Sequence, residues 1–197
     1  MTPDSTEIKD AADMAKLVEG HDAALNSLME RHGEKVFHYL IRQVQNEAEA
    51  ADLAQETFVR VYQNRVRFKL SARFTTWLYT IATNLARDRF RWRARHPQVS
   101  LEAENPSTEG TLTDVLADEK PGPSEEMQRT ERAAAVRHAI ARLPEDLRTA
   151  LILFEYDGQS HAEIAVIAGC SVKAVESRLF RARQLLRSHL AGLSDPA

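Results

Sequence analysis

A long polar segment in the middle of the chain limits the fold more than any other feature of the sequence. Between Pro97 and Met127 the chain reads PQVSLEAENPSTEGTLTDVLADEKPGPSEEM, which holds four prolines, two glycines and many acids. Few aromatic or regularly spaced apolar residues occur in it, so it cannot bury enough surface to form a core. We therefore expect a flexible acidic linker between two folded parts.

Both parts show helical periodicity. Apolar residues recur three and four positions apart, and no stretch alternates apolar and polar residues as a half-buried strand does. The elements expected before the linker are a helical block over 8–45 with interruptions near Gly20 and Gly33, a helix over 47–63, and a helix from Phe74 that ends at Pro97. The sequence thus predicts an all-α protein with two small helical domains, 8–96 and 129–192, joined by a linker over 97–128.

The charges of the chain are strongly segregated, although its formal net charge is only -3. From Arg60 to Arg95 ten basic residues face a single acid, a balance of +9, and from Glu102 to Glu131 nine acids face two bases, a balance of -7. Neighbouring like charges repel and destabilise a compact fold unless a polyanion or carboxylates compensate them. The pattern predicts a face for nucleic acid beside an acidic segment.

Composition excludes several classes of protein. The single cysteine, Cys170, rules out an internal disulfide, and no His/Cys cluster has the spacing of a zinc site. No apolar run is long enough to span a bilayer, and no nucleophile motif or phosphate-binding glycine loop occurs. We expect a cytoplasmic protein that needs no metal or cofactor, does not insert into a membrane and is not an enzyme.

The clearest local motif is SHAEIAVIAGCSVKAVESRLFRARQLL near the C-terminal end of the sequence. Ser160 and Glu163 have the spacing of a capping box, Gly169 suits a left-handed helix end, and Ser171 can cap a longer basic helix. A short helix, a tight turn and a basic second helix are typical of a helix-turn-helix that places its second helix in the major groove. An ordinary helical hairpin with a solvated basic face is the alternative.

The basic stretch FRWRARHP interleaves aromatic rings with arginines. Rings can stack on unpaired bases while arginines hold phosphates, which suits single-stranded or melted nucleic acid, although a solvated helix end has the same pattern. Trp77 and Trp92 fall on the apolar stripe of their helix, so we interpret both as core residues. Phe68, in the loop NRVRFKLSAR, is the better candidate for contact with a base.

The helix EAEAADLAQETFVRVYQ carries Asp52 and Glu56 on the side away from its apolar stripe. No His, Lys or metal ligand lies at a useful spacing for acid/base catalysis. A solvated helix face and a docking patch for a basic partner both remain open on these residues alone.

Three stretches in this order, DLAQETFVRVYQ, RFTTWLYTIATNLARDRFRWR and LPEDLRTALILFEYDGQSHAEIAVIAGCSVKAVESRLFRARQLL, resemble the extracytoplasmic-function sigma factors of bacterial RNA polymerase. The resemblance covers the chain from about Ala24 to Leu190 apart from the linker. It implies an all-α promoter-recognition subunit whose first domain handles the minus-ten element and whose second handles the minus-thirty-five element. It also implies regulation by an anti-sigma factor that covers the polymerase-binding faces.

Residue by residue, the resemblance assigns three sites. It implies that the clamp helices of the largest subunit of core RNA polymerase contact Asp52, Gln55 and Glu56. It implies that minus-ten DNA contacts a loop with Arg65, Phe68, Ser71 and Arg73, and a helix with Thr76, Asn84, Arg87 and Arg91. It implies that the minus-thirty-five element contacts Ser171, Lys173, Glu176, Ser177, Phe180, Arg181 and Arg183.

Two residues depart from the family pattern. An aromatic residue often stands where His161 is, and a basic residue where Glu176 is. Glu176 can accept a hydrogen bond from cytosine, or it can pair with Lys173 within the helix. The other function that the helix-turn-helix allows is a stand-alone regulator of duplex DNA, against which the acidic face at Asp52 and Glu56 argues.

Overall fold

The computed structural model describes residues 5–96 and 123–191, which form helices joined by short turns. No strand occurs within these two ranges, and the predicted all-α fold class is confirmed. The elements in chain order are α1 (Ser5–Val18), α2 (Ala23–Val44), α3 (Glu47–Gln63), the short 3₁₀ helix η1 (Arg65–Arg67), α4 (Phe74–Arg95), α5 (Pro123–Ala141), α6 (Glu145–Glu155), α7 (His161–Ala168) and α8 (Val172–Leu190).

The helices before the linker follow the predicted bounds closely, with one exception. Gly20 lies in the turn between α1 and α2 with a positive φ, as its predicted interruption requires. Gly33 was expected to interrupt the block, but it lies inside α2. Leu28, His32, Val36 and Leu40 continue a buried stripe past it. This burial outweighs the cost of about 1 kcal/mol that glycine adds to a helix interior.

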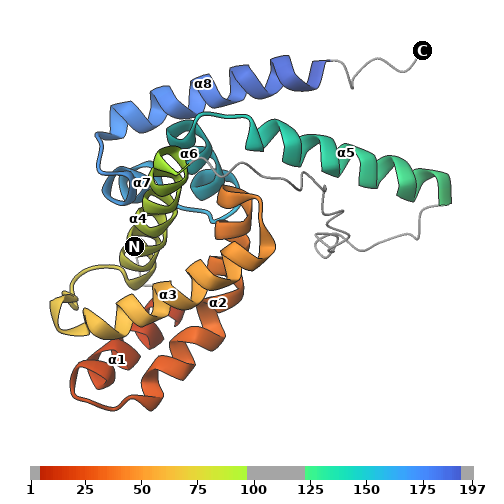
Figure 1. The fold of residues 1–197 in the computed structure, drawn as a ribbon. Coiled ribbons are helices and arrows are strands. Elements are labelled where there is room, and N and C mark those ends of the chain that lie inside the picture. Colours follow the sequence, from red (N-terminus) through yellow and green to blue (C-terminus); the bar gives the residue numbers. More distant parts are fainter. Residues whose placement is uncertain (1–4, 97–122, 192–197) are drawn as a thin grey trace.

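Helices α3 and α4 lie side by side in the N-terminal part. Asn46 caps α3 by accepting a hydrogen bond from the backbone nitrogen of Glu49 at 2.9 Å. Tyr39 of α2 is fully buried, and its hydroxyl is 2.7 Å from the hydroxyl of Thr83 in α4. Figure 1 shows α4 running from the group α1–α3 towards the group α6–α8. Helix α4 therefore contacts helices of both parts of the chain.

The C-terminal part begins with α5, which starts at Pro123 and therefore inside the range predicted to be linker. Proline is favourable at the first position of a helix because its missing N–H has no partner there in any case. Residues 97–122 of the predicted linker lie outside the described residues. In Figure 1 the first turns of α5 extend away from the other helices, while its end approaches α6.

The hydrophobic core runs through both parts without a break. Within the C-terminal part, α6 packs against α7 and α8, and fully buried side chains such as Leu147, Ile152 and Ile164 fill the space between them. Contacts of α4 with α7 and of α2 with α6 then join this part to the N-terminal part. The two predicted helical units are thus packed against each other in this structure.

Candidate functional site

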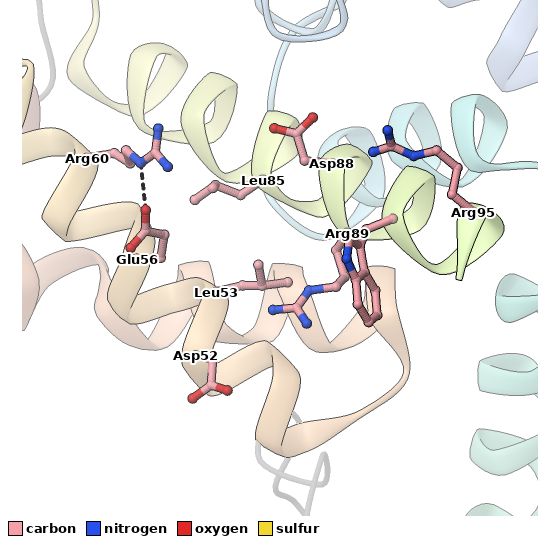
Figure 2. A pocket seen from close by; sticks show the side chains of 9 residues that line it. Asp52, Leu53, Glu56, Arg60, Leu85, Asp88, Arg89 and Arg95 are labelled. Carbon is pink, nitrogen blue, oxygen red and sulfur yellow. Dashed lines mark hydrogen bonds and ion pairs between the residues drawn. The ribbon is translucent and has the colours of Figure 1, made fainter. Parts of the chain in front are cut away.

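A groove of about 670 Å³ lies between α3 and α4 and contains the predicted docking face (Figure 2). Leu53 and Leu85 form its apolar floor, and charged side chains from both helices surround them. The residues that line it are Asp52, Leu53, Glu56, Arg60, Leu85, Asp88, Arg89, Trp92 and Arg95.

The predicted docking residues differ in their ion pairs and in their exposure. Glu56 accepts a hydrogen bond from Arg60 at 2.6 Å, as Figure 2 shows. Asp52 is exposed and makes no ion pair with any residue in the described ranges. Gln55 is exposed but does not line the groove, and Phe58 is buried as predicted. The arrangement leaves Asp52 available for a cationic partner.

Trp92 was expected in the core, and this prediction is wrong. Its side chain is 41% exposed, it lines the groove, and its ring stacks on that of His96 with centroids 4.8 Å apart. Glu49 of α3 pairs with Arg89 and Arg93 on either side of Trp92, so this end of α4 has a neighbouring helix, but the Trp92 ring lies at the groove between the two helices. Trp77 behaves as predicted, because its ring packs against Phe68 and Phe74.

Phe68, the predicted base-contacting residue, lies in the core of this structure. Its side chain is 8% exposed, and its ring centroid is 5.1 Å from that of Trp77 and 6.1 Å from that of Phe74. The loop folds back onto the start of α4, so the ring is not accessible to a base in this conformation. Ser71 in the same loop is exposed. Arg65 lies over the ring of Tyr62 at 4.2 Å from its centroid.

The polar stripe of α4 carries the remaining minus-ten residues. Arg73 pairs with Glu7 and Glu163, and Arg87 pairs with Glu145 at 2.9 Å. The other three members of the stripe differ in their surroundings. Arg91 pairs with Asp88, Asn84 is exposed, and the Thr76 hydroxyl is buried without a hydrogen-bond partner in the described part of the chain.

The helix-turn-helix prediction is confirmed in its local geometry. Ser160 and Glu163 form both hydrogen bonds of the capping box, and Gly169 ends α7 in the left-handed conformation with φ of 64°. Ser171 caps α8 by accepting a hydrogen bond from the backbone nitrogen of Ala174. At the departure from the family pattern, His161 packs against Phe154 with ring centroids 5.1 Å apart. These features place α8 as the exposed second helix.

All seven predicted minus-thirty-five residues are exposed, on α8 or at its cap. They are Ser171, Lys173, Glu176, Ser177, Phe180, Arg181 and Arg183. Glu176 has no ion-pair partner within residues 5–96 and 123–191, so the alternative pair with Lys173 is not formed. Arg183 instead pairs with Glu155 at 2.8 Å and lies over the ring of Phe154. An unpaired Glu176 is free to accept a hydrogen bond from a ligand.

Sequence analysis missed a set of polar contacts between the two parts of the chain. The Tyr79 hydroxyl donates to Asp157 at 2.7 Å. The guanidinium of Arg148 donates to the backbone oxygen of Gln43 at 2.7 Å, and Arg42 lies over the ring of Tyr156. No signal in the sequence marks these residues, because each pair joins positions far apart in the chain.

The environment of Asp157 changes its proton affinity. Burial raises the pKa of Asp157 to about 6, although the hydrogen bond from Tyr79 and the positive charges of Arg42 and Lys35 act in the opposite direction. Burial and the nearby charge of Asp157 also raise the pKa of the Tyr79 hydroxyl. The contact between the two parts of the chain therefore contains a group that titrates near neutral pH.

The described ranges hold no group of three or more His, Cys, Asp and Glu side chains that could bind a metal ion. The same ranges contain no helix long and apolar enough to cross a membrane.

Comparison with known proteins accounts for both parts of the chain. The family model described as sigma-70 region 2 matches residues 28–96, and the one described as sigma-70, region 4 matches residues 133–186. The RNA polymerase sigma-H factor of Pseudomonas aeruginosa is 35% identical over 192 residues, which cover 95% of this chain and 97% of that protein. The ECF RNA polymerase sigma-E factor of Escherichia coli is 36% identical over 186 residues, which cover 92% and 94%.

Solved structures agree with this likeness. The structure of CnrH in complex with the cytosolic domain of CnrY has a TM-score of 0.68 and 26% identity, and the match covers 95% of this chain and 99% of that one. The sigma factor RpoE of Bartonella quintana, in complex with the anti-sigma factor NepR, has the same fold with a TM-score of 0.64 and 24% identity, over 84% of this chain and 96% of that one.

The chain therefore belongs to the sigma-70 family of RNA polymerase sigma factors. The full-length likeness to curated ECF sigma factors places it in the extracytoplasmic-function group. As a sigma factor it directs RNA polymerase to promoters. The alternative of a stand-alone helix-turn-helix regulator is not favoured, because the likeness covers region 2 as well as region 4.

Proposed function

We propose that this sigma factor binds polymerase and promoter DNA through three separate surfaces. The groove between α3 and α4 binds the clamp helices of the largest polymerase subunit, the polar stripe of α4 binds the melted minus-ten strand, and α8 enters the major groove at the minus-thirty-five element. The protein performs no catalytic step itself and acts in the cytoplasm together with core polymerase. The two domains are 8–96 and 129–192, although α5 already begins at Pro123.

The observation that carries this proposal is the groove itself. It offers an apolar floor at Leu53 and Leu85, and next to it the exposed carboxylate of Asp52 without a cation. An apolar centre with charged edges suits a protein partner, whose charges then fix the register. Glu56 also lines the groove and needs only to exchange Arg60 for a cation of the partner.

The two DNA surfaces are supported by exposure and charge. Asn84 and Arg91 lie on the outside of α4, and Lys173, Glu176 and Arg181 lie on the outside of α8. Arginine and lysine hold phosphates, whereas a side chain such as Glu176 can distinguish bases by accepting from cytosine. Phe68 can join the minus-ten site only if the loop leaves the core, since its ring packs on Phe74 and Trp77 here.

An anti-sigma factor is the regulator that we propose for this chain. The CnrH structure supports this, because it shows a protein similar over 95% of this chain bound to the cytosolic domain of CnrY. A regulatory protein of this kind would compete with core polymerase for the same surfaces.

The docking role is tested by charge reversal in the groove. Replacing Asp52 and Glu56 by Lys should weaken the binding of core polymerase about tenfold, because like charges across an interface are costly. The matched control replaces Glu30 and Glu34, which are exposed on α2 outside the groove, by Lys. Affinity is measured by titration of labelled core polymerase, and thermal unfolding by circular dichroism verifies the fold.

Two results would contradict the docking role. One is wild-type affinity for core polymerase in the doubly reversed Asp52 and Glu56 variant. The other is equal weakening by the Glu30 and Glu34 control, which would assign the effect to net charge. Run-off transcription from a randomised promoter library, with wild-type protein and core polymerase, tests promoter selection independently of both variants.

A further inference from the structure

Helix α1 carries a buried carboxylate that the three proposed surfaces do not use. Asp10 is 1% exposed, and each of its two carboxylate oxygens lies 2.9 Å from Nε2 of His32 in α2. His32 is also buried, at 4% exposure. A carboxylate only accepts hydrogen bonds, so Nε2 donates to it. Because burial of a charge is costly, such a pair needs a reason beyond the filling of the core.

Neighbouring hydrogen bonds fix the position of α1 along α2. Arg31 Nε donates to Asp10 at 3.0 Å, and another nitrogen of the same guanidinium donates to Asp13 at 2.6 Å. Asp10 and Asp13 lie one turn apart on α1, whereas Arg31 and His32 are consecutive in α2. Hydrogen bonds between charged groups depend on direction, so α1 cannot slide or rotate against α2 without breaking them.

The ring of His32 connects this pair to the start of α4. It packs against Phe74, the first residue of α4, with ring centroids 5.3 Å apart. Phe74 is buried and contacts Phe68 and Trp77, which also contact each other. We call Phe68, Phe74 and Trp77 the aromatic cluster. Asp10 fixes the orientation of the His32 ring, and this orientation in turn fixes the position of the aromatic cluster.

The aromatic cluster holds both ends of the loop that the proposed function assigns to minus-ten DNA. Phe68 precedes and Phe74 follows the residues 69–73, all of which are exposed. The backbone nitrogen of Ala72 donates to the backbone oxygen of Lys69 at 2.8 Å, which makes a tight turn between the two rings. A displacement of either ring therefore moves this turn and the side chains that it presents.

Helix α1 also contacts this loop directly. Glu7, one turn before Asp10, pairs with Arg73 at the end of the loop. Contacts between α1 and η1 reach the other side, where the loop begins. The family model for region 2 matches residues 28–96, so α1 lies before the matched range. The likeness to this model therefore assigns no role to Asp10.

We propose that Asp10 and His32 are positioning residues for minus-ten recognition. Their hydrogen bond orients the His32 ring, the ring fixes the aromatic cluster, and the cluster presents the loop 69–73 to an unpaired base. The inference rests on the proposed role of this loop in minus-ten binding. A site distinguishes bases only when its hydrogen-bonding groups are held in the right geometry, so a looser cluster lowers discrimination between bases.

A role in stability alone makes a different prediction. Replacing a buried ion pair by apolar side chains of similar size leaves stability unchanged or higher, but it removes the directional constraint. The apolar variant is Asp10→Leu with His32→Phe, which keeps a ring beside Phe74 without the hydrogen bond. The control is Tyr39→Phe with Thr83→Val, which removes another buried hydrogen bond, about two turns along α2 from His32.

Each variant is assembled with core polymerase, and the rate of open-complex formation is measured on promoters with each base at the minus-ten positions that a selection with wild type identifies. The apolar variant should bind core polymerase and unfold thermally as wild type does. Its discrimination between preferred and other minus-ten bases should fall about three- to tenfold, and its minus-thirty-five preference should not change. The control should match wild type at both elements.

Two single substitutions separate the hydrogen bond from the ring, and they keep the test decisive if the apolar variant does not fold. Asp10→Asn keeps an oxygen that accepts from His32, so it should retain most of the wild-type discrimination. His32→Gln can still donate to Asp10 but removes the ring beside Phe74, so it should lose discrimination as the apolar variant does.

Fluorine NMR of protein labelled with fluorotryptophan supplies a readout without DNA. The chain has two tryptophans, Trp77 in the aromatic cluster and Trp92, which is exposed at the groove. The Trp77 signal should shift or broaden in the apolar variant and in His32→Gln. The Trp92 signal should stay in place and serve as an internal reference.

Wild-type discrimination in the apolar variant and in His32→Gln overturns the proposal, as does an equal loss of discrimination in the control. An unchanged Trp77 signal together with reduced discrimination also overturns it, because the aromatic cluster then does not carry the effect. Failure of the wild-type protein to support promoter-dependent transcription would instead refute the proposed function and leave the NMR result standing.

Discussion

The pKa of Asp157 predicts that contact between the two parts of the chain weakens as pH rises. The groups that face its carboxyl are Tyr79 on α4 and Tyr39, Arg42 and Lys35 on α2. Burial is the largest influence, and it raises the pKa from the ordinary value of 3.8 to about 6. The protein therefore binds this proton more tightly when its two parts are in contact than when they are separated or unfolded.

The sign and size of the effect follow from linkage. Protonation of Asp157 stabilises the contact between the two parts. This stabilisation is fully present below pH 3.8 and is lost as pH rises through about 6. The rise in pKa corresponds to about 3 kcal/mol at 1.36 kcal/mol for each pH unit. Partial solvent screening reduces the amount that we expect to measure to about 1 to 2 kcal/mol.

The perturbation is Asp157→Asn, which keeps an oxygen to accept from the Tyr79 hydroxyl and cannot ionise. The assay compares thermal unfolding and radius of gyration for wild type and variant between about pH 5 and pH 8. The variant should be more stable and more compact than wild type near pH 8, and the difference should shrink towards pH 5. Parallel pH curves for the two proteins would refute the reasoning, since every other titrating group is common to both.

Two predictions concern the exposed face of α8. Glu176→Arg should move the preference at one minus-thirty-five base pair from cytosine to guanine, which a selection over randomised sequences measures, and an unchanged consensus would eliminate base contact. Arg181→Ala should lower affinity for all sequences alike and reduce the slope of log affinity against log salt by about 1, measured by titration at several salt concentrations. A loss restricted to one sequence would contradict phosphate contact by Arg181.

Local signals in the sequence predicted the helices well, because these signals depend on neighbours within one turn. The helix over 47–63 has the predicted bounds, and its cap at Asn46 satisfies the first free N–H groups. The turn at Gly169 likewise follows from local backbone geometry. Gly33 failed as a helix end because a glycine weakens a helix only slightly, whereas the buried stripe from Leu28 to Leu40 stabilises it.

The aromatic residues show where periodicity stops being informative. An apolar stripe tells which face of a helix can be buried, but it does not tell which positions on that face a partner helix covers. Trp92 lies on the stripe and yet is exposed, because its ring lies at the open groove between α3 and α4. Phe68 lies in a loop and yet is buried, because the loop returns to Phe74 and Trp77. Both errors concern tertiary partners that one-dimensional patterns do not contain.

The acids that pair with the arginines of α4 show that the charge pattern of a sequence, like its apolar pattern, does not identify tertiary partners. Segregation in the sequence pointed to nucleic acid as the partner of the basic stretch and did not identify carboxylates that pair with it. In the structure, Glu7, Glu145 and Glu163 neutralise Arg73 and Arg87, and Arg73 and Glu163 are 90 residues apart. These acids look like ordinary first-turn and capping residues of their own helices. Because first-turn carboxylates already favour helix N-termini, a second role in holding α4 leaves no separate mark on the sequence.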